Sequence, residues 1–373
     1  MIDPEVLVKL IDRLDSYPVG LPDAPEIREF LNIFLSPDEA YLASIFPFKE
    51  VTSIELASHA GWGQEKVEST LNSLAEKGAV FDFKLEEGRV YWLLTPSVFG
   101  FIEFSMMKIR RDLPMGKLAG LLDAYEENHL KKEVFGSKTQ ISRALVDFDV
   151  PVSSQIMTTS EIEQLIIESG GGCAQTCYCR QKKQLLGKGC TLTPPQETCF
   201  TISKAGADFL VRRGFGVRIT AEEMIGRVRK LGKLGLIHVT DNIRSKPSFI
   251  CNCCGCCCVL LSGITQKKIP HAVSPTQYIL NINRELCRGC GRCAEKCQIK
   301  SISIGNKKAE LDSLNCLGCG SCIKFCGHGA LSLVARSKPP RIPKTDNAKF
   351  LRIAFEKGKL PAMAWRILKS KFW

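Results

Sequence analysis

Cys287-Arg288-Gly289-Cys290-Gly291-Arg292-Cys293-Ala294-Glu295-Lys296-Cys297 and Cys316-Leu317-Gly318-Cys319-Gly320-Ser321-Cys322-Ile323-Lys324-Phe325-Cys326 are the two stretches that decide the fold of this chain. Each has the spacing C-x2-C-x2-C-x3-C, and the second follows the first at an offset of 29 residues (316 − 287). Apolar residues recur at the same offset, since Ile302 and Ile304 correspond to Leu331 and Leu333. The chain therefore contains an internal duplication, and the thiol spacing favours metal ligands over disulfide bridges.

This duplication resembles the bacterial two-[4Fe–4S] ferredoxin family, whose cysteine spacing it shares. The resemblance covers Tyr278 to Ala335, and we predict a ferredoxin-like two-cluster domain over residues 278–336. It implies that Cys287, Cys290, Cys293 and Cys326 hold cluster 1. It implies that Cys316, Cys319, Cys322 and Cys297 hold cluster 2, because the fourth cysteine of each motif serves the other cluster. The family usually has proline after that cysteine, where this chain has Gln298 and Gly327. A pair of zinc knuckles is the alternative interpretation.

The remaining composition is that of a globular protein, with 373 residues, 45% hydrophobic and 24% charged. All 19 cysteines lie beyond residue 172. The chain begins Met1-Ile2-Asp3-Pro4-Glu5, with acids where a signal peptide has a basic start. No stretch reaches the ~18 apolar residues of a membrane span. We therefore expect a cytoplasmic protein, in which thiols stay reduced.

A second group of cysteines predicts a cysteine-rich metal or iron–sulfur domain over residues 161–277. Its candidate ligands are Cys177, Cys179, Cys190, Cys199, Cys251, Cys253, Cys254, Cys256, Cys257 and Cys258. Thiolates this crowded repel one another unless a cation holds them. We predict one or two further iron–sulfur clusters here, with Arg180 offsetting their charge. A four-thiolate zinc site and another soft-metal site are the alternatives, and no histidine is assigned as a ligand.

The N-terminal region, residues 1–160, is predicted to be a mainly helical domain. Residues 36–96 combine capping signals at Ser36 and Thr52, a helix from Gln64 to Lys77, and a hairpin over 80–84 and 90–94. This order of elements resembles the winged-helix family. Between Glu50 and Leu94, however, eight acids oppose four bases. DNA binding depends on neutralising phosphates, so we expect a scaffold or docking role and consider DNA an unlikely partner. Residues 97–160 are expected to be helical, including Lys138–Val146.

The C-terminal residues 337–373 form a basic amphipathic tail. They carry ten Lys or Arg and two acids, which accounts for +8 of the net charge of +12. Basic helices with aromatic anchors can lie on anionic membranes. We expect peripheral contact with the inner membrane face, contact with an acidic partner, or packing of the tail on the acidic N-terminal part of the chain.

Together these features predict an α+β protein that relays single electrons through two [4Fe–4S] clusters and a central metal centre. The whole arrangement looks like a group of anaerobe proteins, and this resemblance implies electron transfer as a component of an oxidoreductase with a redox partner protein. The alternatives are a reductase whose active metal lies in the central domain, or a redox-sensing winged-helix regulator. No G-x-G-x-x-G fingerprint follows a strand, so we predict no bound NAD or FAD.

Overall fold

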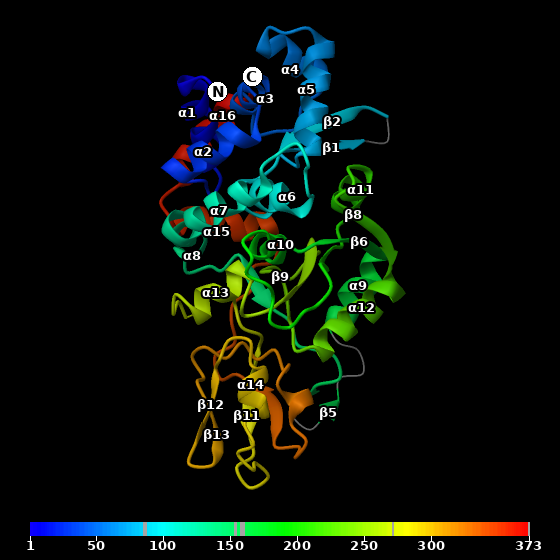
Figure 1. Cartoon of the computed structure of the whole chain (residues 1–373), viewed down its shortest axis with the longest axis vertical. Coiled ribbons are helices and arrows are strands. Elements are labelled where there is room, and N and C mark those ends of the chain that lie inside the picture. The colour runs from blue at the N-terminus through cyan, green and yellow to red at the C-terminus, as the bar shows by residue number, and fades with distance from the viewer. Residues whose placement is uncertain (85–87, 153–154, 157–160, 271, 372–373) are drawn as a thin grey trace.

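The computed structural model describes residues 1–84, 88–152, 155–156, 161–270 and 272–371. Helices and sheets are mixed along the chain, in agreement with the predicted α+β class. Figure 1 shows the N-terminal helices at one end of the long axis, the ferredoxin-like strands at the other, and a sheet between them.

The N-terminal part is mainly helical. Its elements are α1 (Pro4–Asp15), α2 (Pro25–Phe34), α3 (Pro37–Ser44), α4 (Ser53–Ala60), α5 (Gln64–Glu76), η1 (Ser97–Phe101), α6 (Ile102–Met107), α7 (Met115–Tyr125), η2 (Glu126–Leu130) and α8 (Lys131–Phe135). They form around one large apolar core that contains Phe30, Phe34 and Phe101. The rings of Phe30 and Phe34 stack with centroids 5.3 Å apart.

The local signals predicted for residues 36–96 are confirmed. Ser36 and Thr52 both form capping boxes, with Glu39 and Glu55 as their reciprocal partners. Strand β1 (Val80–Lys84) pairs antiparallel with β2 (Val90–Leu94) in the expected hairpin. Val51 forms a further bridge to Trp92, which ties the start of α4 to the hairpin.

The central part is built on an antiparallel sheet with the strand order β3-β9-β10-β7-β6-β8. These strands are β3 (Ser142–Ala144), β6 (Gly171–Thr176), β7 (Glu197–Thr201), β8 (Gly216–Thr220), β9 (Ile237–Asp241) and β10 (Phe249–Cys253). Cys251 of β10 lies directly opposite Cys199 of β7. Because side chains alternate along a strand, Cys251 and Cys253 share a face and Asn252 takes the other.

Helices cover both faces of this sheet. On one face, α9 (Glu161–Ser169) and α12 (Ala221–Lys233) pack on Phe200 and Ile250. Helix α12 begins with a capping box formed by Thr220 and Glu223. On the other face, α10 (Tyr178–Leu185) and α11 (Lys204–Arg212) join the N-terminal core. Helix α13 (Val259–Thr265) follows the turn that carries the last central cysteines.

The helix expected over Lys138–Val146 is wrong. The segment contains strand β3, whose three residues are buried and pair with β9. Tertiary pairing overrides the weak local preference for helix at this short stretch. Strands β4 (Pro151–Val152) and β5 (Gln155–Ile156) follow, and β4 lies parallel to β14 (Leu331–Ala335). The sheets thus include residues that precede the predicted division at residue 160.

The ferredoxin-like part repeats a simple unit. Its elements are β11 (Tyr278–Ile282), α14 (Arg292–Lys296), β12 (Ile302–Gly305), β13 (Lys308–Leu311), η3 (Ile323–Phe325) and β14. Strand β11 pairs antiparallel with β14, and β12 pairs antiparallel with β13. The two cysteine loops lie between these strands.

The basic tail folds back on the chain through α15 (Asp346–Glu356), which is followed by α16 (Leu360–Lys371). Ile353 enters the N-terminal core. Buried Lys349 lies 3.4 Å from Asp241 of the central sheet, and Lys357 lies 2.9 Å from Glu133. Packing on the N-terminal part, one of the three expectations for this tail, is therefore present in α15. Among the described residues, no helix combines the length and hydropathy that crossing a bilayer requires.

Candidate iron–sulfur and thiolate sites

The eight ferredoxin-like cysteines lie around two separate hollows. Cys287, Cys290, Cys293 and Cys326 line one of them. Cys297, Cys316, Cys319 and Cys322 line the other. Each hollow thus takes three cysteines from one loop and the fourth from the other loop. This is the exchange that the ferredoxin resemblance implies for the two cluster sites.

The backbone around these hollows suits anionic sulfur. The amide of Ala309 donates to Cys287 Sγ at 3.4 Å, and the amide of Ser301 donates to Cys297 Sγ at 3.3 Å. The first bond, with one from Gly289, lowers the pKa of the Cys287 thiol. Gly318 has a φ of +65°, and a Cβ there would lie 2.0 Å from the carbonyl oxygen of Tyr278. Glycine therefore lets this loop close tightly around its hollow.

Comparison with known proteins agrees with this geometry. The model of the 4Fe-4S dicluster domain family matches residues 279–327. The chain carries a ferredoxin-like iron–sulfur domain. Neither the curated proteins nor the solved structures contain a match to the chain.

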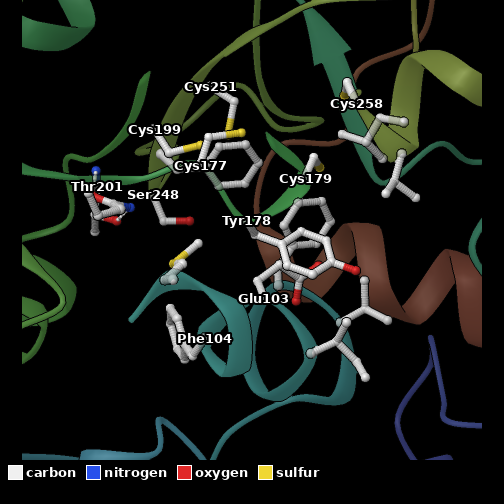
Figure 2. Close-up of a pocket in the computed structure, with 18 of the residues that line it drawn as sticks. Glu103, Phe104, Cys177, Tyr178, Cys179, Cys199, Thr201, Ser248, Cys251 and Cys258 are labelled. Atoms are coloured by element: carbon white, nitrogen blue, oxygen red, sulfur yellow. Dashed lines mark hydrogen bonds between the residues drawn. The ribbon is translucent and has the colours of Figure 1, made fainter. Parts of the chain in front are cut away.

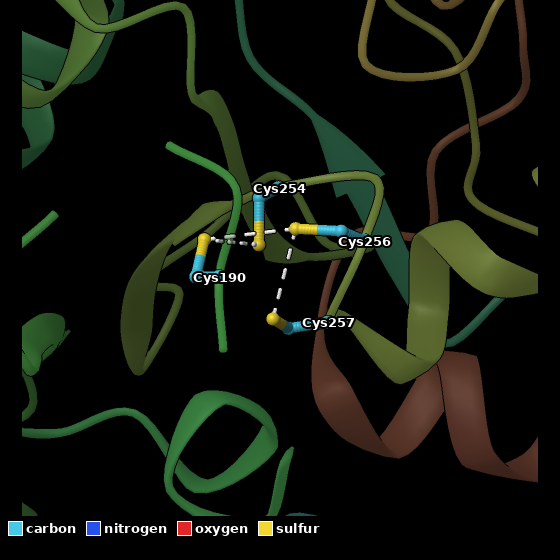
Figure 3. Close-up of side chains that lie close together, drawn as sticks. All are labelled: Cys190, Cys254, Cys256 and Cys257. Carbon is cyan, nitrogen blue, oxygen red and sulfur yellow. Dashed lines mark hydrogen bonds between the residues drawn. The ribbon is translucent and has the colours of Figure 1, made fainter. Parts of the chain in front are cut away.

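The ten candidate ligands of the central region separate into two groups. The first, which we call the compact site, consists of Cys190, Cys254, Cys256 and Cys257 (Figure 3). Their sulfur atoms all lie within 4.8 Å of one another, with Cys190 at 3.6 Å from both Cys254 and Cys256. A tetrahedral ion with metal–sulfur bonds of about 2.3 Å has sulfur–sulfur edges of about 3.8 Å. The compact site therefore has the dimensions of a single four-thiolate ion.

The second group, which we call the thiol wall, contains the other six: Cys177, Cys179, Cys199, Cys251, Cys253 and Cys258. They form a series of neighbours in the order Cys251, Cys199, Cys177, Cys179, Cys258 and Cys253. All six line one cavity, and Figure 2 labels five of them there. Contacts with Cys179 and Cys199 hold the pKa of the Cys177 thiol well below its usual range.

The thiol wall differs from the compact site in its spacing. Among the described residues, only the compact site brings three or more potential metal ligands within 4.8 Å of one another. The wall shares its wider spacing with the eight ferredoxin-like cysteines, which surround hollows. A group of thiols spread around a space suits a multinuclear cluster better than one ion.

Local structure explains why neighbouring cysteines join different groups. Cys199, Cys251 and Cys253 project from one face of paired strands β7 and β10. After β10, the turn directs Cys254, Cys256 and Cys257 toward Cys190. Cys258 then occupies the N-cap position of α13 and belongs to the thiol wall. The sequence contains the six thiols in eight residues, but it does not show this alternation.

Several contacts join the central region to the ferredoxin-like part, and two of them reach residues at or next to cysteines of the second hollow. The amide of Gly255 donates to Gln298 Oε1 at 3.0 Å, and Gln298 directly follows Cys297. In the second contact, the amide of Asp147 donates to the carbonyl oxygen of Cys319 at 2.9 Å. Asp147 Oδ1 also lies 3.1 Å from Nε2 of buried His238. The other ring nitrogen of His238, Nδ1, lies 2.6 Å from Oδ1 of Asn252, the residue between two wall cysteines on β10. His238 is thus engaged with protein partners.

Two candidate functional residues were not predicted from the sequence. Glu103 and Tyr178 border the cavity beside the thiol wall. Glu103 is the single acid in the apolar stretch from Val98 to Met107, a signal that could have identified it. Cys173 is not a candidate ligand, because it is buried in the N-terminal core. Burial raises the pKa of its thiol to about 11.

Proposed function

We propose that this protein relays single electrons through two [4Fe–4S] clusters to a further iron–sulfur centre on the thiol wall. The observation that carries the proposal is the exchange of the fourth cysteine between the two hollows. Cys326 belongs to the second loop but lines the first hollow, and Cys297 does the reverse. This crossing places the two cluster sites in one small domain, which suits rapid electron exchange between the two clusters.

The chain's own residues fit these groups. A [4Fe–4S] cluster, when bound, takes up and releases one electron at a time. The cysteine thiolates would hold it, and the amides of Ala309 and Ser301 would stabilise negative charge on the sulfur. Four of the eight cysteines, Cys287, Cys293, Cys316 and Cys322, are buried, whereas Cys290 of the first hollow is exposed.

The route onward from the second hollow is short. Cys253 and Cys258 of the thiol wall share an apolar cluster with Ile299 and Leu317, against which Cys297 and Cys319 also pack. The contact between Gly255 and Gln298 holds the two regions together at this point. We propose that electrons pass between Cys297 or Cys319 and the wall through this cluster.

The compact site serves a different purpose in this proposal. We propose that it holds one zinc ion, because a tetrahedral set of four thiolates is typical of structural zinc sites. Such a set leaves no open position for a substrate. The ion fastens the loop around Cys190 to the turn at 254–257. Its role is to keep the turn in place, and through the turn the arrangement of the thiol wall.

We propose a scaffold role for the winged-helix-like module, in preference to DNA binding. Its hairpin contacts the central region, where Asp82 Oδ1 accepts from Arg213 Nε at 2.9 Å. Phe81 packs on Phe209 of α11 with centroids 4.5 Å apart. These contacts commit the hairpin to the chain itself, which argues against the regulator alternative. A redox partner protein is expected to exchange electrons at the ferredoxin-like end.

Metal analysis of anaerobically purified protein tests the proposal. Two four-iron clusters give about eight irons per chain, so we expect more than eight irons and one additional ion. The double variant Cys177→Ser with Cys199→Ser should lose only the iron in excess of eight and keep the reduced ferredoxin EPR signal. An iron content of eight in the wild type would refute the centre on the wall, and colourless protein would refute the whole proposal.

A further inference from the structure

The cavity beside the thiol wall has the size and lining of a ligand site. It occupies about 390 Å³ between the central sheet and the N-terminal helices. The side facing the wall is largely apolar and includes Phe81, Val98, Phe99, Ile102, Phe104 and Leu130. Small-molecule sites typically measure about 300–1,000 Å³ and combine an apolar lining with a few polar groups.

This space exceeds what a cluster alone requires. The two ferredoxin-like hollows, each lined by four cysteines and their own loops, leave about 20 Å³ each. The cavity is some twenty times larger by the same measure, and residues of the β1–β2 hairpin and α6 help to enclose it. Room therefore remains beside any group that the wall cysteines hold.

Among the polar groups that line this cavity, Tyr178 and Glu103 are two that could donate a hydrogen bond to a ligand beside the apolar side. The Tyr178 hydroxyl has no hydrogen-bond partner among the described residues, although only 5% of the residue is exposed. The Glu103 carboxyl is enclosed by protein, and its side chain is accessible only in part. Figure 2 shows Tyr178 across the middle of the cavity with Glu103 beneath it. Burial raises the pKa of Glu103 to about 7, so at lower pH its carboxyl is a hydrogen-bond donor.

The charges at the cavity exclude an anionic ligand. Arg180 is the one cation among the lining residues that the structure describes. Its guanidinium donates to Thr198, to the carbonyl oxygen of Asn252 and to Cys254 Sγ. Its charge also interacts with the sulfur atoms of Cys177 and Cys190, which would be thiolates when they hold metal. Glu126, also at the cavity, is paired with buried Lys182. Because the cysteine thiolates balance the charge of Arg180, these residues offer no further cation to balance a carboxylate or a phosphate.

We propose that this cavity binds a small, uncharged, aromatic or alicyclic molecule whose carbonyl oxygen accepts hydrogen bonds from Tyr178 and Glu103. This inference rests on the proposed function in one respect: the bound molecule would lie beside the thiol wall, where the relayed electrons arrive. Binding itself needs no electron transfer. The two proposals can therefore fail separately.

Anaerobic equilibrium dialysis of the full-length, metal-loaded protein against acetophenone tests the inference. We expect one molecule bound per chain with a Kd below about 1 mM, which is reasonable for a ligand of this size. Benzoate, the charged analogue of similar shape, should bind at least tenfold more weakly. Tyr178→Phe should weaken acetophenone binding about fivefold, the effect of one hydrogen bond.

Cavity-filling variants provide the structural control. Val98→Phe should weaken acetophenone binding more than tenfold, with unchanged iron content and EPR signal. Leu260→Phe, which fills the cavity from α13, serves if the first variant does not fold. Val217→Phe, on an exposed strand position, should bind like the wild type. Equal binding by wild type and both filled variants, tight benzoate binding, or no acetophenone binding at about 10 mM would overturn the inference, whatever the metal analysis shows.

Discussion

Replacing Glu103 with glutamine should make the protein more stable at alkaline pH and should remove part of its pH dependence. Burial raises the pKa of Glu103 from 4.5 to about 7, and nearby Glu126 adds to the increase. The amides of Phe99 and Gly100 counteract the shift without cancelling it. The folded protein therefore holds this proton more tightly than the unfolded chain does.

The magnitude follows from proton linkage. Between pH 4.5 and 7 the folded state binds more protons than the unfolded state, so stability falls as the pH rises. Each unit contributes about 1.4 kcal/mol, so from pH 5.5 to 8 the wild type should lose about 2 kcal/mol through this one group. Glu103→Gln keeps the shape of the side chain and does not titrate. The variant should lack this loss, and its advantage over the wild type should grow by about 2 kcal/mol across the range.

Thermal unfolding of the metal-loaded protein at fixed scan rate measures this difference. About 2 kcal/mol corresponds to a change of about 4–8 °C for a unit of 150–250 residues. Titrating groups that do not interact with Glu103 contribute to both proteins and cancel in the comparison. Glu65→Gln, at an exposed position of α5, is the matched control and should follow the wild type. A melting temperature for Glu103→Gln that parallels the wild type at every pH would refute the burial argument.

Three further predictions concern the metal site and the contacts between parts. Cys256→Ser should remove one metal ion per chain and leave the iron of the ferredoxin-like domain in place, as measured by elemental analysis with Cys173→Ala as control; loss of about four irons would instead indicate a cluster at the compact site. Gly255→Ala should loosen the contact between the central region and the ferredoxin-like part, because its Cβ would lie 1.9 Å from the carbonyl oxygen of Gln298. Overpacking of this kind costs about 1–3 kcal/mol, and faster hydrogen exchange around residues 254–258 should report it. Gly189→Ala is the control and should have no effect, because no atom lies within 4 Å of its added Cβ. Asp82→Asn should lower stability by about 2–3 kcal/mol, since buried Asp82 accepts hydrogen bonds from both Arg212 and Arg213; an unchanged urea midpoint would show that the hairpin does not hold the central region.

Much of the local structure could be predicted because it depends on residues close in sequence. The caps at Ser36, Thr52 and Thr220 each involve a partner three positions away. The hairpin at 80–94 was equally clear, since its strands are rich in β-formers around a glycine turn. Strand β3 was missed because its stability comes from β9, nearly a hundred residues later in the chain.

The sequence by itself determined the ferredoxin-like domain, because its duplicated spacing C-x2-C-x2-C-x3-C places ligands within single loops and needs little else. Only the tertiary structure decided how the ten central cysteines divide, since strand pairing and one turn place adjacent thiols in different groups. The same holds for the cavity, whose Glu103 and thiol wall lie more than seventy residues apart along the chain. Spacing along a chain records contacts within a loop, whereas contacts between distant segments depend on how the sheet and helices pack.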